Sequence, residues 1–221
     1  MRADQHLNGL CRRSFLKTSA ATAAMTFIGA WELSGIAHAD AFTKAERDKL
    51  SPDDILALMK KGNERFYTGK REAHNFLAQQ RASAKGQYPA AVLLSCIDSR
   101  ASAETILDLR IGDVFNSRVA GNVENSDILG SMEFACKLAG AKVVLVMGHT
   151  ACGAIKGAID NAELGNLTGL LEKIKPAVAA TTYTGERTSK NYTFVDAVAR
   201  KNVELTITRA CFGWVESGDS P

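Results

Sequence analysis

The chain has 221 residues, of which 46% are hydrophobic and 23% charged, as is typical of one soluble globular domain rather than a disordered segment. A formal net charge of +3, without a run of like charges, gives no sign of a nucleic-acid partner. Five cysteines, an odd number in a chain of this length, argue against a complete disulfide framework.

The N-terminal segment has the features of an export signal. Arg12-Arg13-Ser14-Phe15-Leu16-Lys17 precedes a mildly apolar stretch, residues 18–36, and Ala37-His38-Ala39 has small residues where a signal peptidase reads them. The segment resembles a twin-arginine signal. A membrane anchor is the alternative, but the stretch is rich in Ala, Thr and Gly and contains a glutamate, which makes a poor transmembrane helix. We therefore predict a cleaved signal at residues 1–39 and an exported, periplasmic bacterial domain at residues 40–221, with no stable membrane anchor after cleavage.

The remaining chain alternates between strand and helix patterns. Ser51 and Pro52 have the residue types of a helix cap and a first helical position, and Gly140 is the type that ends a helix. The expected strands are short apolar runs, the last of them β-branched and bounded by glycine. In chain order we expect a helix from Ser51, strands at 90–95 and 114–119, a helix at 126–138, a strand at 142–148, and helices near 153–162, 167–180 and 194–209. This alternation predicts an α/β domain with a mainly parallel β-sheet flanked by helices.

Two of the expected strands end in residue types that bind metal ions. Cys96 follows the strand at 90–95, and His149 and Cys152 follow the strand at 142–148. If these strands are neighbours, the three side chains converge at the carboxyl edge of the sheet. Two thiolates and one imidazole suit tetrahedral zinc, and three protein ligands leave the fourth position open, as in a catalytic site. A disulfide between Cys96 and Cys152 is the redox alternative.

Asp98 and Arg100 follow the first of these strands. They lie two residues apart in an extended turn, so both side chains can face the same side. A carboxylate beside a guanidinium group stays ionised at neutral pH. Without the neighbouring metal ligands, an ordinary surface salt bridge explains the pair equally well.

Three segments resemble the β-class carbonic anhydrases in order and separation: Cys96-Ile97-Asp98-Ser99-Arg100, Arg118-Val119-Ala120-Gly121-Asn122 and Gly148-His149-Thr150-Ala151-Cys152-Gly153. The resemblance covers roughly residues 50–209. It implies that Cys96, His149 and Cys152 bind Zn²⁺, and that Asp98 and Arg100 form the catalytic pair beside the metal.

The same resemblance implies the reaction, the substrate pocket and the assembly. The reaction would be the reversible hydration of carbon dioxide to bicarbonate and a proton. Gln87 would hydrogen-bond the substrate, and Phe115 and Ala120 would form apolar walls. The protein would be a homodimer or larger, with Gln87 and Phe134 near the subunit boundary.

The C-terminal region departs from this family. Family members continue beyond the helix at 191–209 with a parallel strand and an antiparallel edge strand, whereas residues 217–221 have no strand character. We therefore expect a C-terminally short domain without these strands, in which the strand before His149 lies at an exposed edge.

Other functions remain open. A related hydrolase of carbonyl sulfide or carbon disulfide would use the same metal chemistry, and a non-catalytic zinc-binding protein would use the same ligands. A nucleotide-binding α/β domain is disfavoured because no Gly-x-Gly-x-x-Gly or phosphate-loop motif follows a strand.

Overall fold

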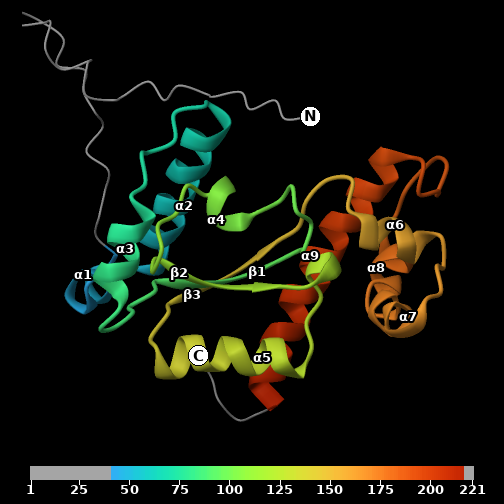
Figure 1. Ribbon diagram of the computed structural model, residues 1–221. Coiled ribbons are helices and arrows are strands. Elements are labelled where there is room, and N and C mark those ends of the chain that lie inside the picture. The colour runs from blue at the N-terminus through green and yellow to red at the C-terminus, as the bar shows by residue number, and fades with distance from the viewer. Residues whose placement is uncertain (1–40, 217–221) are drawn as a thin grey trace, which may run out of the picture. The chain divides into compact units, whose positions relative to one another are not determined.

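The structure, a computed structural model, describes residues 41–216 (Figure 1). The signal predicted at residues 1–39 lies outside this range. Within it, none of the helices combines the length and the apolar character needed to cross a membrane.

Helices and parallel strands alternate along the described chain. The first half contains α1 (Lys44–Lys49), α2 (Pro52–Tyr67), α3 (Phe76–Ser83), β1 (Ala91–Ser95), α4 (Ala103–Ile106), β2 (Val114–Arg118) and the 3₁₀ turn η1 (Ala120–Asn122). The second half contains α5 (Ser126–Glu133), the π-helical turn η2 (Phe134–Leu138), β3 (Val143–Met147), α6 (Gly153–Ile159), α7 (Gly165–Glu172), α8 (Lys175–Ala180) and α9 (Tyr192–Glu216). The predicted α/β class is confirmed.

The three strands form one parallel sheet in the order β2-β1-β3. The register places Ser95, the last residue of β1, beside Arg118 of β2 and Met147 of β3. The loops that follow β1 and β3 therefore leave the same edge of the sheet side by side. This confirms the neighbour relation on which the predicted metal site depended.

Helices cover both faces of the sheet (Figure 1). Successive side chains of a strand point to opposite faces, and accordingly Leu93 packs with α2 and α4, whereas Leu94 packs with α5, η2 and α9. All five residues of β1 are buried as a result. A third apolar cluster joins α6, α7, α8 and α9 and includes Cys96 and Cys152, so these two predicted ligands lie in a packed core.

Local sequence signals account for several element ends. Ser51 caps α2 in a capping box: its hydroxyl accepts the Asp54 N–H at 3.2 Å, and the Asp54 carboxylate accepts the Ser51 N–H at 2.9 Å. Gly140 follows η2 with φ +80°, and a Cβ there would lie 2.6 Å from Nη1 of Arg47. Only glycine satisfies both conditions without strain.

Two predicted helices differ in detail from those observed. The helix predicted at 126–138 is α-helical only to Glu133 and then widens into η2. The helix predicted at 167–180 is two helices, α7 and α8. Pro176 lies in the first turn of α8, where its missing N–H breaks no helical hydrogen bond, and the chain restarts there instead of continuing.

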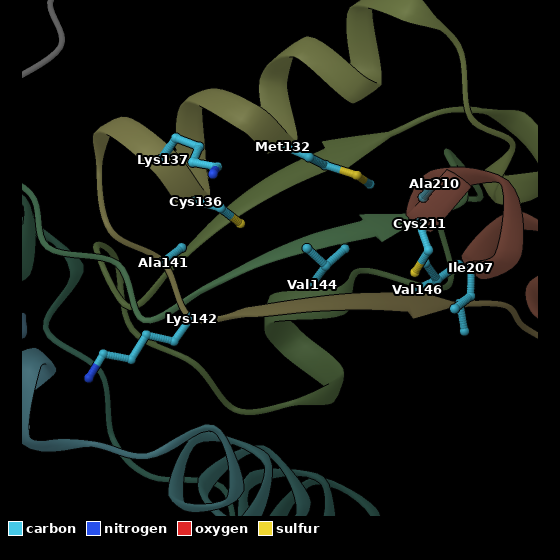
Figure 2. A pocket seen from close by; sticks show the side chains of 10 residues that line it. All are labelled: Met132, Cys136, Lys137, Ala141, Lys142, Val144, Val146, Ile207, Ala210 and Cys211. Carbon is cyan, nitrogen blue, oxygen red and sulfur yellow. The ribbon is translucent and has the colours of Figure 1, made fainter. Parts of the chain in front are cut away.

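β3 is an edge strand of the described sheet, as predicted. Only Val146 of its five residues is buried, in contrast to the fully buried β1. An apolar groove of about 410 Å³ lies beside it, between η2 and the last turns of α9 (Figure 2). The half-buried Cys136 and the exposed Cys211 line opposite sides of this groove.

Candidate metal centre

The three predicted ligands converge where β1 and β3 end. Cys96 is the first residue after β1, and His149 lies in the turn between β3 and α6. Cys152 is the N-cap residue of α6. The ligand atoms of the three side chains lie within 4.8 Å of one another. The convergence inferred from strand order is therefore confirmed.

The two cysteines are free thiols held close together. Their sulfur atoms lie 4.0 Å apart, about twice the ~2.05 Å length of a disulfide bond, so the structure shows the dithiol form. A hydrogen bond from Cys152 lowers the pKa of Cys96 to about 4 against the opposing effect of burial. That same hydrogen bond, and then burial, raise the pKa of Cys152. A second negative charge is thus strongly disfavoured until a cation compensates it.

His149 presents an unpartnered nitrogen to this pair. Its Nδ1 lies 2.9 Å from the Thr150 carbonyl oxygen, and donation there leaves the lone pair of the neutral ring on Nε2. Nε2 is buried and has no hydrogen-bond partner. A buried lone pair of this kind needs a proton donor or a metal ion. Two sulfurs and this nitrogen make a donor set that fits Zn²⁺.

Asp98 and Arg100 form a two-pronged ion pair beside the ligands. Arg100 donates from Nε to Oδ1 at 2.9 Å, from Nη2 to Oδ2 at 2.8 Å, and from its backbone N–H to Oδ1 at 3.0 Å. These bonds hold the pKa of the Asp98 carboxyl well below its usual range. Oδ2 lies 3.9 Å from Nε2 of His149, so the carboxylate borders the space that the ligand atoms surround.

Two residues of the second motif fix the position of Cys96. Gly121 donates its backbone N–H to the Cys96 sulfur at 3.3 Å from a left-handed conformation with φ +69°. Arg118 donates from Nε to the Cys96 carbonyl at 2.9 Å and from Nη2 to the Asp98 carbonyl at 2.7 Å. Both residues belong to the motif at 118–122, and no role was predicted for either of them. The Gly121-Asn122 pair after a strand was the available signal, because these residue types tolerate the positive φ of a tight turn.

Helix α9 supplies two further contacts that sequence reasoning missed. Nδ2 of the fully buried Asn202 donates to the Gly121 carbonyl at 2.7 Å. Oδ1 of Asp196 accepts the Ala151 N–H at 3.0 Å. One helix therefore contacts both the turn that carries His149 and Cys152 and the η1 turn, whose Gly121 donates to the Cys96 sulfur.

The three predicted substrate residues do not all lie near the predicted metal ligands. Ala120 is in η1, next to the Gly121 that contacts Cys96. Phe115 lies on β2, opposite Val92 of β1. Its ring packs edge-to-face on the ring of Phe134, with centroids 6.0 Å apart. Gln87 is exposed in the segment before β1, at the opposite end of that strand from Cys96. Within one chain, Ala120 is the one of these three residues that lies beside the ligand residues, and the substrate roles of all three stay predictions.

Comparison with known proteins relates this site to a family. The family model described as "Carbonic anhydrase" matches residues 91–211. The protein named "Carbonic anhydrase 2" in Mycobacterium tuberculosis is 39% identical over 134 residues, 58% of this chain and 65% of the relative. The "Carbonic anhydrase" of Mycolicibacterium smegmatis is 36% identical over the same shares. The chain thus spans slightly less than two thirds of these relatives.

Solved structures give the same relation. The β-carbonic anhydrase CafA of Aspergillus fumigatus matches with a TM-score of 0.53 and 26% identity, covering 72% of this chain and 74% of that one. The tetrameric β-carbonic anhydrases of Sordaria macrospora match with a TM-score of 0.51 and 27% identity, covering 72% of this chain and 80% of theirs. The chain belongs to the carbonic anhydrase family, within its β class.

Proposed function

We propose that the protein catalyses the reversible hydration of carbon dioxide to bicarbonate and a proton, with Cys96, His149 and Cys152 holding Zn²⁺. The observation that carries this proposal is the convergence of two buried sulfurs and the unpartnered Nε2 of His149 beside an ionised Asp98. When bound at such a site, zinc supplies a water of lowered pKa for attack on carbon dioxide.

Asp98 and Arg100 act as a pair in this proposal. The carboxylate is ionised and can only accept hydrogen bonds, so it would orient the reacting water by accepting a hydrogen bond from it. Arg100 engages both carboxylate oxygens and would thereby keep Asp98 from binding a metal ion held by the three ligand residues. Ala120, beside the loop that contacts Cys96, contributes an apolar wall for the uncharged substrate.

Stopped-flow measurement of carbon dioxide hydration by the zinc-loaded protein tests the proposal. We expect fast turnover, and a loss on the order of 100-fold or more in a Cys152→Ala variant, since a ligand is removed. Zinc content and circular dichroism are measured on both proteins. A folded, zinc-containing protein without carbon dioxide turnover would contradict the proposal. Parallel assays with carbonyl sulfide and carbon disulfide identify a related hydrolase.

We further propose that the protein is a homodimer or larger. Gln87 and its own Cys96 lie at opposite ends of β1, which at five residues is roughly 16 Å long, so Gln87 would serve a metal site only in a neighbouring copy. The Sordaria macrospora relatives, which are described as tetrameric, give independent support. Light scattering coupled to size-exclusion chromatography measures the assembly, and a monomer at micromolar concentration would contradict this proposal.

The proposed location is the bacterial periplasm, reached through the twin-arginine route. The support is the sequence of residues 1–39, with its Arg12-Arg13 pair. Replacing both arginines by lysine should leave uncleaved precursor in the cytoplasm, as measured by cell fractionation. Equal export of the lysine variant and the unaltered chain would argue against this route.

A further inference from the structure

The turn between two of the metal-binding residues contains a strained position. Ala151, between His149 and Cys152, has φ +54°, in the left-handed region that a residue with a Cβ rarely adopts. Such a conformation persists only where surrounding contacts hold it. Because φ of Ala151 sets the direction of the chain between the two ligands, it also sets how close Nε2 of His149 and the Cys152 sulfur come.

Asp196 provides the contact that holds this position. Its Oδ1 accepts the Ala151 N–H at 3.0 Å, across 45 residues of sequence. This hydrogen bond ties the turn at residues 149–151 to α9. The backbone around Asp196 is held in place by packing. Val195 and Val198, on either side of Asp196 in α9, are fully buried in the apolar cluster that contains Cys96 and Cys152.

We propose that Asp196 is a positioning residue of the metal centre, which holds Ala151 in the left-handed conformation and so presets the spacing of His149 and Cys152. This inference rests on the zinc site of the proposed function but not on the identity of the substrate. A preset turn lets the ligands meet the metal ion without first reorganising the loop. Its loss should therefore weaken metal retention rather than act only on turnover.

The test is a rescue experiment on the full protein. Asp196→Ala removes the acceptor and should speed the loss of zinc to a chelator roughly tenfold, the lower end of the range for groups that orient metal ligands. Glycine adopts a positive φ without penalty, so Ala151→Gly in the Asp196→Ala background should recover most of the zinc retention. Asp196→Asn keeps an oxygen that accepts the same N–H and should stay near the unaltered protein.

A matched control separates this effect from general damage to α9. Glu204 lies on the same helix, and the described hydrogen bond of its side chain goes to Lys201 rather than to residues 149–151. Glu204→Ala should leave zinc release unchanged. The thiolate-to-metal absorption of the cobalt-substituted protein gives a second readout. It should change in Asp196→Ala and return toward the original spectrum when Ala151→Gly is added.

Several outcomes would overturn the inference. Zinc release from Asp196→Ala no faster than from Glu204→Ala would show that the contact is not needed. Faster release without rescue by Ala151→Gly would assign the effect to the stability of α9 instead, and an unaltered protein that binds no zinc would remove the basis altogether. A zinc-retaining protein without carbon dioxide turnover would refute the proposed function while leaving this inference testable, because zinc release is measured without substrate.

Discussion

At the scale of single residues, the site depends on how each charge is held. The Asp98 carboxylate is bound by a planar guanidinium that uses two nitrogens at once, a geometry that fixes both its ionisation and its direction. Lysine carries the same charge but only as a point on a flexible stem. The proposed function therefore depends on the shape of Arg100 as well as on its charge.

Arg100→Lys tests this dependence. We expect carbon dioxide hydration to fall roughly 10- to 100-fold, because one ammonium group cannot hold both carboxylate oxygens. Zinc content should stay unchanged, since Arg100 contacts none of the ligand atoms in the described hydrogen bonds. The measurement is kcat/KM with metal analysis on the same sample. Full activity in the lysine variant would show that charge alone suffices.

The buried carboxylate of Asp108 makes the stability of the fold depend on pH. Burial acts to raise the pKa of Asp108, but hydrogen bonds from Arg65 and His74 and from the Glu72 N–H outweigh it and lower the pKa to about 2. The pKa of an unfolded carboxyl is about 3.9. The ionised form therefore stabilises the fold above that value, and the contribution disappears as the pH falls from about 4 to about 2.

Asp108→Asn should remove this contribution. We expect the metal-free variant to unfold with about 2 kcal/mol less free energy at neutral pH, the scale of hydrogen bonds to a charged group. Its stability should also fall less steeply than that of the unaltered protein between pH 4 and pH 2. Denaturant unfolding of metal-free protein across this range measures both. Parallel pH profiles for the two proteins would contradict the assignment.

At the scale of elements, α9 determines much of the site, although it contributes none of the predicted ligands. The sequence predicted a helix near 194–209, and the structure has one at 192–216. Its roles were not predictable from local pattern, because Asn202 contacts Gly121 across 81 residues of sequence. The ligands were predictable because strand ends and residue types are local signals. The contacts that position them depend on tertiary packing, which the sequence pattern does not encode locally.

Asn202→Ala tests whether α9 holds η1 in place through its buried hydrogen bond to Gly121. The change leaves the Gly121 carbonyl without its partner, and we expect a loss of about 1–3 kcal/mol in unfolding free energy. Because Gly121 also donates to the Cys96 sulfur, zinc release should become faster as well. Denaturant unfolding and chelator competition measure the two effects. Unchanged values for both would show that η1 holds its position without α9.

At the scale of the whole molecule, the two edges of the described sheet differ. The β2 edge carries Phe115, which packs on the half-exposed ring of Phe134. The β3 edge borders the apolar groove of Figure 2. Strand order was predictable in part, since parallel strands with ligands at their ends are expected to be neighbours. Pro176 was an available signal for the break between α7 and α8, whereas no local residue type announces the π-helical turn η2.

Copies of the chain are expected to cooperate in forming the carbon dioxide site. If Gln87 serves the metal site of a neighbouring copy, Gln87→Ala and Cys152→Ala damage different halves of each shared site. Subunits carrying only one change should each be impaired, but a mixture that exchanges subunits contains sites with an intact metal centre from one chain and an intact Gln87 from the other. We expect the hydration activity of the mixture to exceed the sum of the activities of the two separate proteins, as measured by stopped-flow assay after incubation.

Mixing two samples of Cys152→Ala is the matched control. Additive activity despite demonstrated subunit exchange would mean that Gln87 does not act across the boundary, and that the carbon dioxide site is built within one chain.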